Sequence, residues 1–155
     1  MSGSRTRRWK RPESVLVVVY TATADVLLLR RREPPDFWQS VTGSLEWGED
    51  PRSAALRELH EETGIDGLEL QDCRKSRRFP IIPPWRARYA PDTDENEEHV
   101  FSLRLAQRVP PTLNPAEHTE FLWLPRDAAA ARVWSWTNRD AILTQVGVGD
   151  RADES

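Results

Sequence analysis

The chain has 155 residues, and its 22 Lys and Arg against 25 Asp and Glu give a formal net charge of −3. This near balance excludes a uniformly basic nucleic-acid coat protein, and no apolar run reaches the roughly 18–20 residues of a membrane span. The single cysteine, Cys73, excludes an internal disulfide and a zinc site built on cysteines. At about 100–200 residues per domain, the length predicts one domain over residues 1–155.

Both ends of the chain are expected to be flexible tails. Residues 1–8 are polar and basic and lack the apolar stretch of a secretory signal, and residues 148–155 are largely polar. We therefore expect a cytoplasmic protein with no nucleic-acid or membrane partner. The composition leaves its oligomeric state undefined.

The first third of the chain predicts strands. Apolar residues, many of them β-branched, fill Ser14–Thr21 and Val26–Leu29, which is typical of two buried strands joined by a short turn. After a loop that contains Pro34 and Pro35, Phe37–Gly43 forms a third, short extended segment.

A helix is predicted next. Asp50 is a good N-cap, Pro51 fits the first helical position, and Ser53–Thr63 is rich in Ala, Leu, Arg and Glu. Gly64 is placed to end the helix, because glycine adopts the left-handed conformation of a helix C-terminus.

The rest of the chain alternates strand, loop and helix signals. Strands are predicted over Leu68–Phe79, Val100–Ala106 and Glu120–Leu124, a long loop over Pro80–Glu98, and helices over Arg126–Arg132 and Asn138–Val146. This order predicts a mixed sheet between helices, an α/β or α+β sandwich.

Carboxylates gather on the predicted helix. Glu58 lies one turn from both Glu61 and Glu62, and like charges at that spacing destabilise a bare helix by a few tenths of a kcal/mol per pair. A solvated helix face is one interpretation. The other is a bound cation, for which carboxylates without His or Cys favour Mg²⁺ or Mn²⁺ over zinc.

The loop before the helix favours the cation. Gly43, five residues, Glu49, seven residues and then Arg57-Glu58-Leu59-His60-Glu61-Glu62-Thr63-Gly64-Ile65 resemble the complete Nudix box. The resemblance implies an α/β/α sandwich with a mixed sheet. It also implies a pyrophosphohydrolase that cleaves a nucleoside-diphosphate-type linkage with a divalent metal.

The resemblance also implies roles for residues. The implied metal ligands are the Gly43 carbonyl and the carboxylates of Glu58, Glu61 and Glu62. Arg57 is implied to orient the glutamates by ion pairing. A further carboxylate from outside the box serves as base or extra ligand, and Glu117 is the candidate.

The substrate is indicated by the segment that leads into the box. Trp38–Gly43 departs from the Pro-Gly-Gly-like sequence common in the family and resembles the pteridine triphosphate hydrolases within it. Further matching patches are Lys10-Arg11-Pro12, Arg31-Arg32, Arg88–Pro91, Glu117-His118, Ser135-Trp136 and Asn138-Arg139. The substrate-binding residues that this likeness implies are Lys10, Arg31, Thr42, Phe79, Pro80, Ile81, Ile82 and Ser135.

Two other functions stay open at this point. One is a housecleaning enzyme that cleaves (d)NTPs or oxidised dNTPs, and the other is a Nudix-fold binding module without catalysis. The partner expected in each enzymatic case is a small-molecule pteridine or nucleoside triphosphate. Among seven Trp, the matching patches favour Trp38 and Trp136 for the pocket over Trp85 and Trp134. His118 is expected to form local hydrogen bonds.

Overall fold

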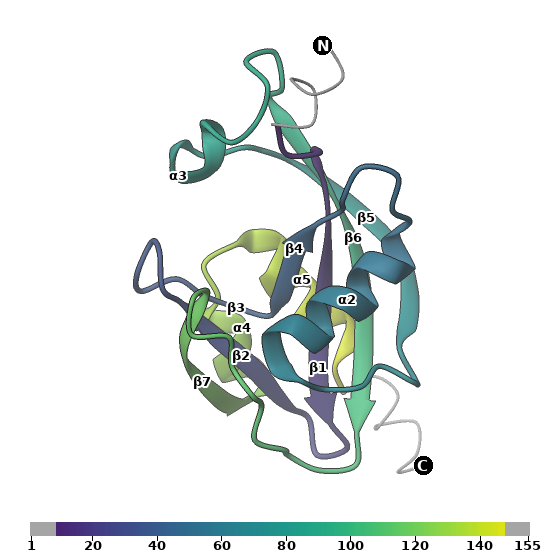
Figure 1. Ribbon diagram of the computed structural model, residues 1–155. Helices are drawn as coiled ribbons and strands as arrows, with labels where there is room; N and C mark the ends of the chain where they lie inside the picture. The colour runs from purple at the N-terminus through teal and green to yellow at the C-terminus, as the bar shows by residue number, and fades with distance from the viewer. Residues whose placement is uncertain (1–8, 148–155) are drawn as a thin grey trace.

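The computed structural model describes residues 9–147, and the two predicted tails lie outside the described residues. A mixed sheet lies between helices (Figure 1), as predicted. Its strands are β1 (Glu13–Thr21), β2 (Asp25–Arg31), β3 (Trp38–Gln39), β4 (Val41–Ser44), β5 (Gln71–Pro80), β6 (Glu95–Leu105) and β7 (His118–Pro125). The helices are α2 (Pro51–Thr63), α3 (Pro83–Arg86), α4 (Arg126–Arg132) and α5 (Trp136–Gln145). No helix in this part of the chain is long and apolar enough to cross a membrane.

β1 is the central strand, and both of its faces are buried. Successive side chains of a strand point to opposite faces of the sheet. Val15, Val17 and Val19 accordingly pack with α2 in one core cluster, while Leu16 and Val18 pack with α4 and α5 in another. The apolar run thus predicts correctly a strand covered by helices on both sides.

The sheet is mixed because β1 has neighbours of both directions. β1 pairs antiparallel with β2 and β4 and parallel with β6. The segment expected to be one extended piece is two strands, β3 on β2 and β4 on β1. Between them, Ser40 donates its N–H to Asn138 Oδ1 over 2.8 Å and accepts from Asn138 Nδ2 over 2.9 Å. This buried pair holds the chain where it changes partner strands.

α2 begins and ends where its capping residues predict. The Asp50 side chain accepts from the Ser53 N–H, Pro51 occupies the first turn, and Gly64 closes the helix at φ 72°. Leu59 is buried in the core, while Leu56, on the neighbouring turn, is exposed.

The region from Pro80 to Glu98 was predicted as one long loop, and this is wrong. It contains α3, and β6 starts at Glu95, where Pro80 pairs with Glu95 and Arg78 with Glu97. The acidic residues tolerate a strand because basic residues of β5 lie opposite them; Arg78 approaches Glu97 at 3.8 Å. α3 is carried on the connection between β5 and β6, away from the other helices (Figure 1).

Candidate active site

A cavity of about 590 Å³ lies where the sheet divides between β3 and β4. It is large enough for a small-molecule ligand. Twelve of the predicted site residues line it: Lys10, Arg31, Thr42, Gly43, Glu58, Glu62, Phe79, Pro80, Ile81, Ile82, Glu117 and Ser135. Of the described residues predicted for the site, Arg57 and Glu61 are the two that do not line it.

Three carboxylates share one side of the cavity. Glu58 and Glu62 project from α2, and Glu117 lies just before β7. Burial raises the pKa of Glu58 to about 7; Arg57 opposes this shift, while Glu61 and Glu117 add to it. Burial, Glu58 and Glu117 raise the pKa of Glu62 well above its usual value. The cluster therefore lacks positive charge at its centre.

This group fits a divalent cation. Glu62 is 1% exposed, and its Oε1 has no hydrogen-bond partner among residues 9–147. A buried acceptor without a partner costs about 1–3 kcal/mol, more when it is charged. A hard cation among the three carboxylates would satisfy that oxygen and remove the charge repulsion.

Gly43 is required by the position of Glu58. A Cβ built on Gly43 would lie 1.6 Å from Glu58 Oε2 and 2.1 Å from its Cδ. The Glu58 carboxylate therefore rests directly on the backbone of β4. Next to it, the Thr42 backbone N–H hydrogen-bonds to Glu62, and the Thr42 hydroxyl donates to the Val15 carbonyl over 2.8 Å.

Arg57 lies outside the cavity and links the loop before α2 to that helix. Its guanidinium donates to both oxygens of Glu49, at 2.8 and 2.9 Å, and to the Ser44 carbonyl at 3.1 Å. It also approaches Glu58 at 3.5 Å and Glu61 at 3.4 Å. Hydrogen bonding to Glu49 raises the pKa of Arg57. The Glu61 side chain is 49% exposed beside this cation.

Cationic side chains share the cavity with the carboxylates. Lys10, Arg31 and Arg88 line it, and burial lowers the pKa of Lys10 and of Arg31. The neighbouring Arg88 lowers both further, while Glu117 opposes the shift in each. The Arg31 guanidinium also lies 5.2 Å from the ring centroid of Trp85. Such a group of partly desolvated cations is suited to phosphate oxygens.

Aromatic residues also line the cavity, and of the two tryptophans that the sequence favoured only Trp136 is among them. Trp85 and Trp134 stack at 5.0 Å, and Phe37 lies 5.8 and 5.2 Å from them. Trp85, Trp134 and Trp136 line the cavity. Trp38 instead packs against the core cluster beneath α4 and α5, so its assignment to the pocket is wrong.

His118 was expected to form local hydrogen bonds, and its ring does not. The side chain is buried, and neither ring nitrogen has a partner in the described part of the chain. Nε2 lies 3.8 Å from Glu62 Oε1. Burial, and then the charge of Arg31, lower the pKa of His118 to about 4, so the ring is neutral at pH 7.

Further polar residues line the cavity without having been predicted for the site, among them Asn96 and Glu98, while Gln39 and Arg88 were noted only as members of matching segments. Glu98 was placed at the end of the predicted long loop, but it belongs to β6 and is 5% exposed. The usable signal was its spacing from Asn96. In a strand, two residues separated by one share a face, but the loop prediction removed that strand.

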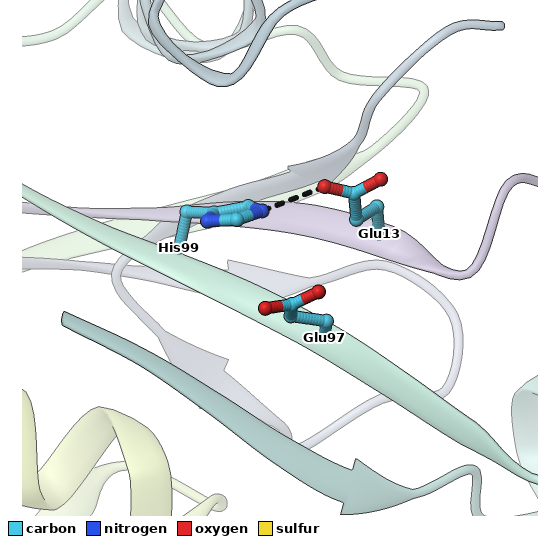
Figure 2. A group of neighbouring side chains, drawn as sticks. All are labelled: Glu13, Glu97 and His99. Atoms are coloured by element: carbon cyan, nitrogen blue, oxygen red, sulfur yellow. Dashed lines mark hydrogen bonds and ion pairs between the residues drawn. The ribbon is translucent and has the colours of Figure 1, made fainter.

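A second acidic group lies outside the cavity. Figure 2 shows Glu13 of β1 with Glu97 and His99 of β6, whose ligand atoms lie within 4.8 Å of one another. Glu13 already accepts from Arg11, at 2.8 and 3.1 Å, and lies 2.8 Å from His99 Nε2. These contacts satisfy the Glu13 carboxylate without a metal, so this group is an ion-pair network.

The family follows from comparison with known proteins. A model described as the NUDIX domain matches residues 10–145. The chain belongs to the Nudix family of hydrolases, whose members typically use a divalent metal.

Two relatives are similar to this chain over most of its length. The chain is 47% identical to the dihydroneopterin triphosphate diphosphatase of Escherichia coli K12 over 139 residues, which cover 86% of this chain and 91% of that protein. It is 41% identical to the Haemophilus influenzae protein of the same name over 140 residues, which cover 87% of each.

Solved structures agree with this likeness. The structure of the E. coli dihydroneopterin triphosphate pyrophosphohydrolase superposes with a TM-score of 0.84 at 45% identity, covering 89% of this chain and 97% of that one. A Nudix hydrolase structure from Listeria monocytogenes, with a TM-score of 0.73 at 22% identity over 93% of this chain and 96% of that one, shows the shared fold.

Proposed function

We propose that this chain hydrolyses 7,8-dihydroneopterin triphosphate to dihydroneopterin monophosphate and pyrophosphate, a step of folate biosynthesis. The observation that carries the proposal is the 47% identity with a dihydroneopterin triphosphate diphosphatase over 86% of the chain. The cavity supports it, because carboxylate, cationic and aromatic side chains all line it.

We assign Mg²⁺, or Mn²⁺ in its place, to the carboxylate side of the cavity. Glu58, Glu62 and Glu117 would hold it, with the Gly43 carbonyl beside them and Glu61 as an auxiliary ligand. When bound, the metal supplies charge neutralisation at the phosphate oxygens and a fixed geometry for the displacement.

The chain's own residues bind and orient the triphosphate. Lys10, Arg31 and Arg88 are placed to pair with phosphate oxygens in the cavity that the carboxylates also line. Arg57 holds the loop against α2 and so fixes the direction of the Glu58 side chain. It acts as a positioning residue.

Proton transfer needs a carboxylate that water can reach. Glu117 is exposed at the edge of the cavity, whereas Glu58 and Glu62 are buried. We assign Glu117 as the group that accepts a proton from the attacking water at its carboxylate oxygen.

The heterocycle occupies the aromatic side. Trp134 and Trp136 offer planar faces there, and Phe79–Ile82 lines the cavity beside them. Ser135 also lines this side, with its Oγ engaged as acceptor of the Asn138 N–H at 3.1 Å. The same Oγ lies 3.3 Å from Thr137 Oγ1, which is within hydrogen-bond distance.

The test is a measurement of pyrophosphate release from dihydroneopterin triphosphate against a panel of nucleoside triphosphates and oxidised dNTPs. We expect kcat/KM for the pteridine to exceed that for each nucleotide by tenfold or more. A tenfold preference for a nucleotide would contradict the proposal and establish the housecleaning alternative.

A further inference from the structure

Two buried side chains of the cavity have no role in the chemistry described above. Asn96 and Glu98 lie two residues apart on β6, so they face the same side of the sheet, and both line the cavity. They are 3% and 5% exposed. Asn96 Oδ1 and Glu98 Oε1 have no hydrogen-bond partner among the described residues. Both atoms therefore need a donor from elsewhere.

Each side chain is fixed through its other polar atom. Asn96 Nδ2 donates to Ser14 Oγ over 2.8 Å, and Thr137 hydrogen-bonds to the Glu98 carboxylate. Ser14 belongs to β1 and Thr137 to α5, and both are buried. The two free acceptors are thus held in place by groups from two other elements, β1 and α5, as expected of a preorganised binding surface.

The environment of Glu98 differs from that of the metal-side carboxylates. Glu58 and Glu62 have Arg57 and His118 beside them, whereas no described residue forms an ion pair with Glu98. Burial raises the pKa of Glu98 to about 7, a shift that hydrogen bonding to Thr137 opposes. No described residue supplies a donor to Glu98 Oε1, so the donor has to come from a ligand.

We propose that Asn96 and Glu98 accept hydrogen bonds from adjacent N–H groups on one edge of the substrate's heterocycle. The chemistry they fit is a 2-amino-4-oxo pyrimidine ring, in which an amino group lies beside a ring N–H. This inference rests on the proposed function, because a pterin carries that edge.

The same two acceptors, on Asn96 and Glu98, discriminate among nucleotide bases. Guanine presents the same pair of neighbouring donors as a pterin does. Adenine and cytosine present an amino group beside a ring nitrogen lone pair, which would face an acceptor and leave it unpaired. A site built to hydrogen-bond a group rejects analogues that lack it far more strongly than an apolar pocket does.

The test compares Glu98→Gln with Glu97→Gln. The two changes are chemically identical and adjacent, but Glu97 belongs to the network outside the cavity (Figure 2). For each variant, kcat/KM is measured with dihydroneopterin triphosphate, GTP and ATP. The Kd of neopterin, which has no phosphates, is measured by its fluorescence.

At pH 8, above the pKa of Glu98, we expect Glu98→Gln to lower kcat/KM for dihydroneopterin triphosphate and GTP by about 10- to 150-fold, which is the range for a lost hydrogen bond to a charged group. ATP hydrolysis should change by less than about threefold, and neopterin binding should weaken as the pteridine activity does. Glu97→Gln should alter none of these by more than about threefold. An equal loss with GTP and ATP, or no loss with either, would overturn the proposal.

If Glu98→Gln fails to fold, Asn96→Ala tests the proposed hydrogen-bond recognition independently. It removes the other acceptor, and the same split between GTP and ATP is expected; its absence in a folded variant contradicts the proposal. The proposed function is judged separately, by the wild-type preference for the pteridine. If that preference is absent, the split between GTP and ATP still decides whether these two acceptors recognise the edge.

Discussion

Replacing Gly43 with Ala should remove activity while leaving the fold intact. The added Cβ would lie 1.6 Å from Glu58 Oε2, and ordinary contact begins at 3.4 Å, so the carboxylate must retreat by 1.8 Å. The atoms in the way belong to the end of a flexible side chain, so the backbone need not move. The change therefore displaces a proposed metal ligand and little else.

The magnitude follows from that displacement. A misplacement of about 1 Å in a catalytic group costs on the order of 100-fold in rate, or about 2.7 kcal/mol. We expect kcat/KM for pyrophosphate release to fall by at least about 100-fold, with Tm within about 3 °C of wild type. Mg²⁺ affinity, measured by isothermal titration calorimetry, should weaken in parallel.

Gly147→Ala is the matched control. Gly147 has φ +84°, and its nearest neighbour for a Cβ is Arg126 Cδ at 3.6 Å, an ordinary contact between residues that do not line the cavity. The strained backbone should cost about 1–2 kcal/mol of stability with activity retained. A Gly43→Ala variant within about threefold of wild-type activity, or one that loses activity only because it unfolds, would refute the reasoning.

Three further predictions concern the carboxylates. Glu62→Gln should abolish most turnover without loss of Tm, because it removes a buried charge along with a proposed ligand; retained turnover would exclude Glu62 from the metal site. Chelation by EDTA should remove activity, with Mg²⁺ restoring it and Mn²⁺ doing so at least partly, and activity that survives EDTA would contradict metal dependence. The pKa of Glu98 is raised by burial to about 7 from 4.5, so the unfolded chain releases this proton first as pH rises. The free energy of unfolding of the wild type, relative to that of Glu98→Gln, should therefore fall by up to about 3 kcal/mol between about pH 4.5 and 7 and stay level above pH 7. Urea unfolding of both proteins at pH 5 and 7.5 measures this difference. A rise over that range would show that Glu98 is not held protonated.

The sequence predicts best where a short local pattern fixes the outcome. β1 is defined by its run of β-branched residues, and α2 by Asp50, Pro51 and Gly64, each of which acts within a turn of its own position. The spacing of the box places Gly43 against Glu58 because the intervening loop and helix are of fixed length. These features need no knowledge of the rest of the chain.

Prediction from the sequence fails where contacts between residues far apart in the chain determine the structure. The acidic start of β6 becomes a strand because β1, far from it in sequence, and β5, on the other side of the α3 connection, lie beside it. The position of Trp38 in the motif predicts a pocket residue, but its side chain packs against the core cluster that includes residues of α4 and α5. Glu98 and His118 are buried through tertiary contacts, which a local reading of a polar residue cannot foresee.

The pairing of β1 with β6 has a consequence for how the molecule assembles. The bond between Asn96 and Ser14 joins residues 82 positions apart, and the Ser40–Asn138 pair spans 98. Contacts of such long range form late in folding, after the β1–β2 hairpin and α2 have had the chance to form locally. During synthesis the cavity can close only once most of the chain has emerged. A ligand that fills the cavity should therefore stabilise the whole fold. An increase in Tm on adding neopterin would then report that the chain has folded completely.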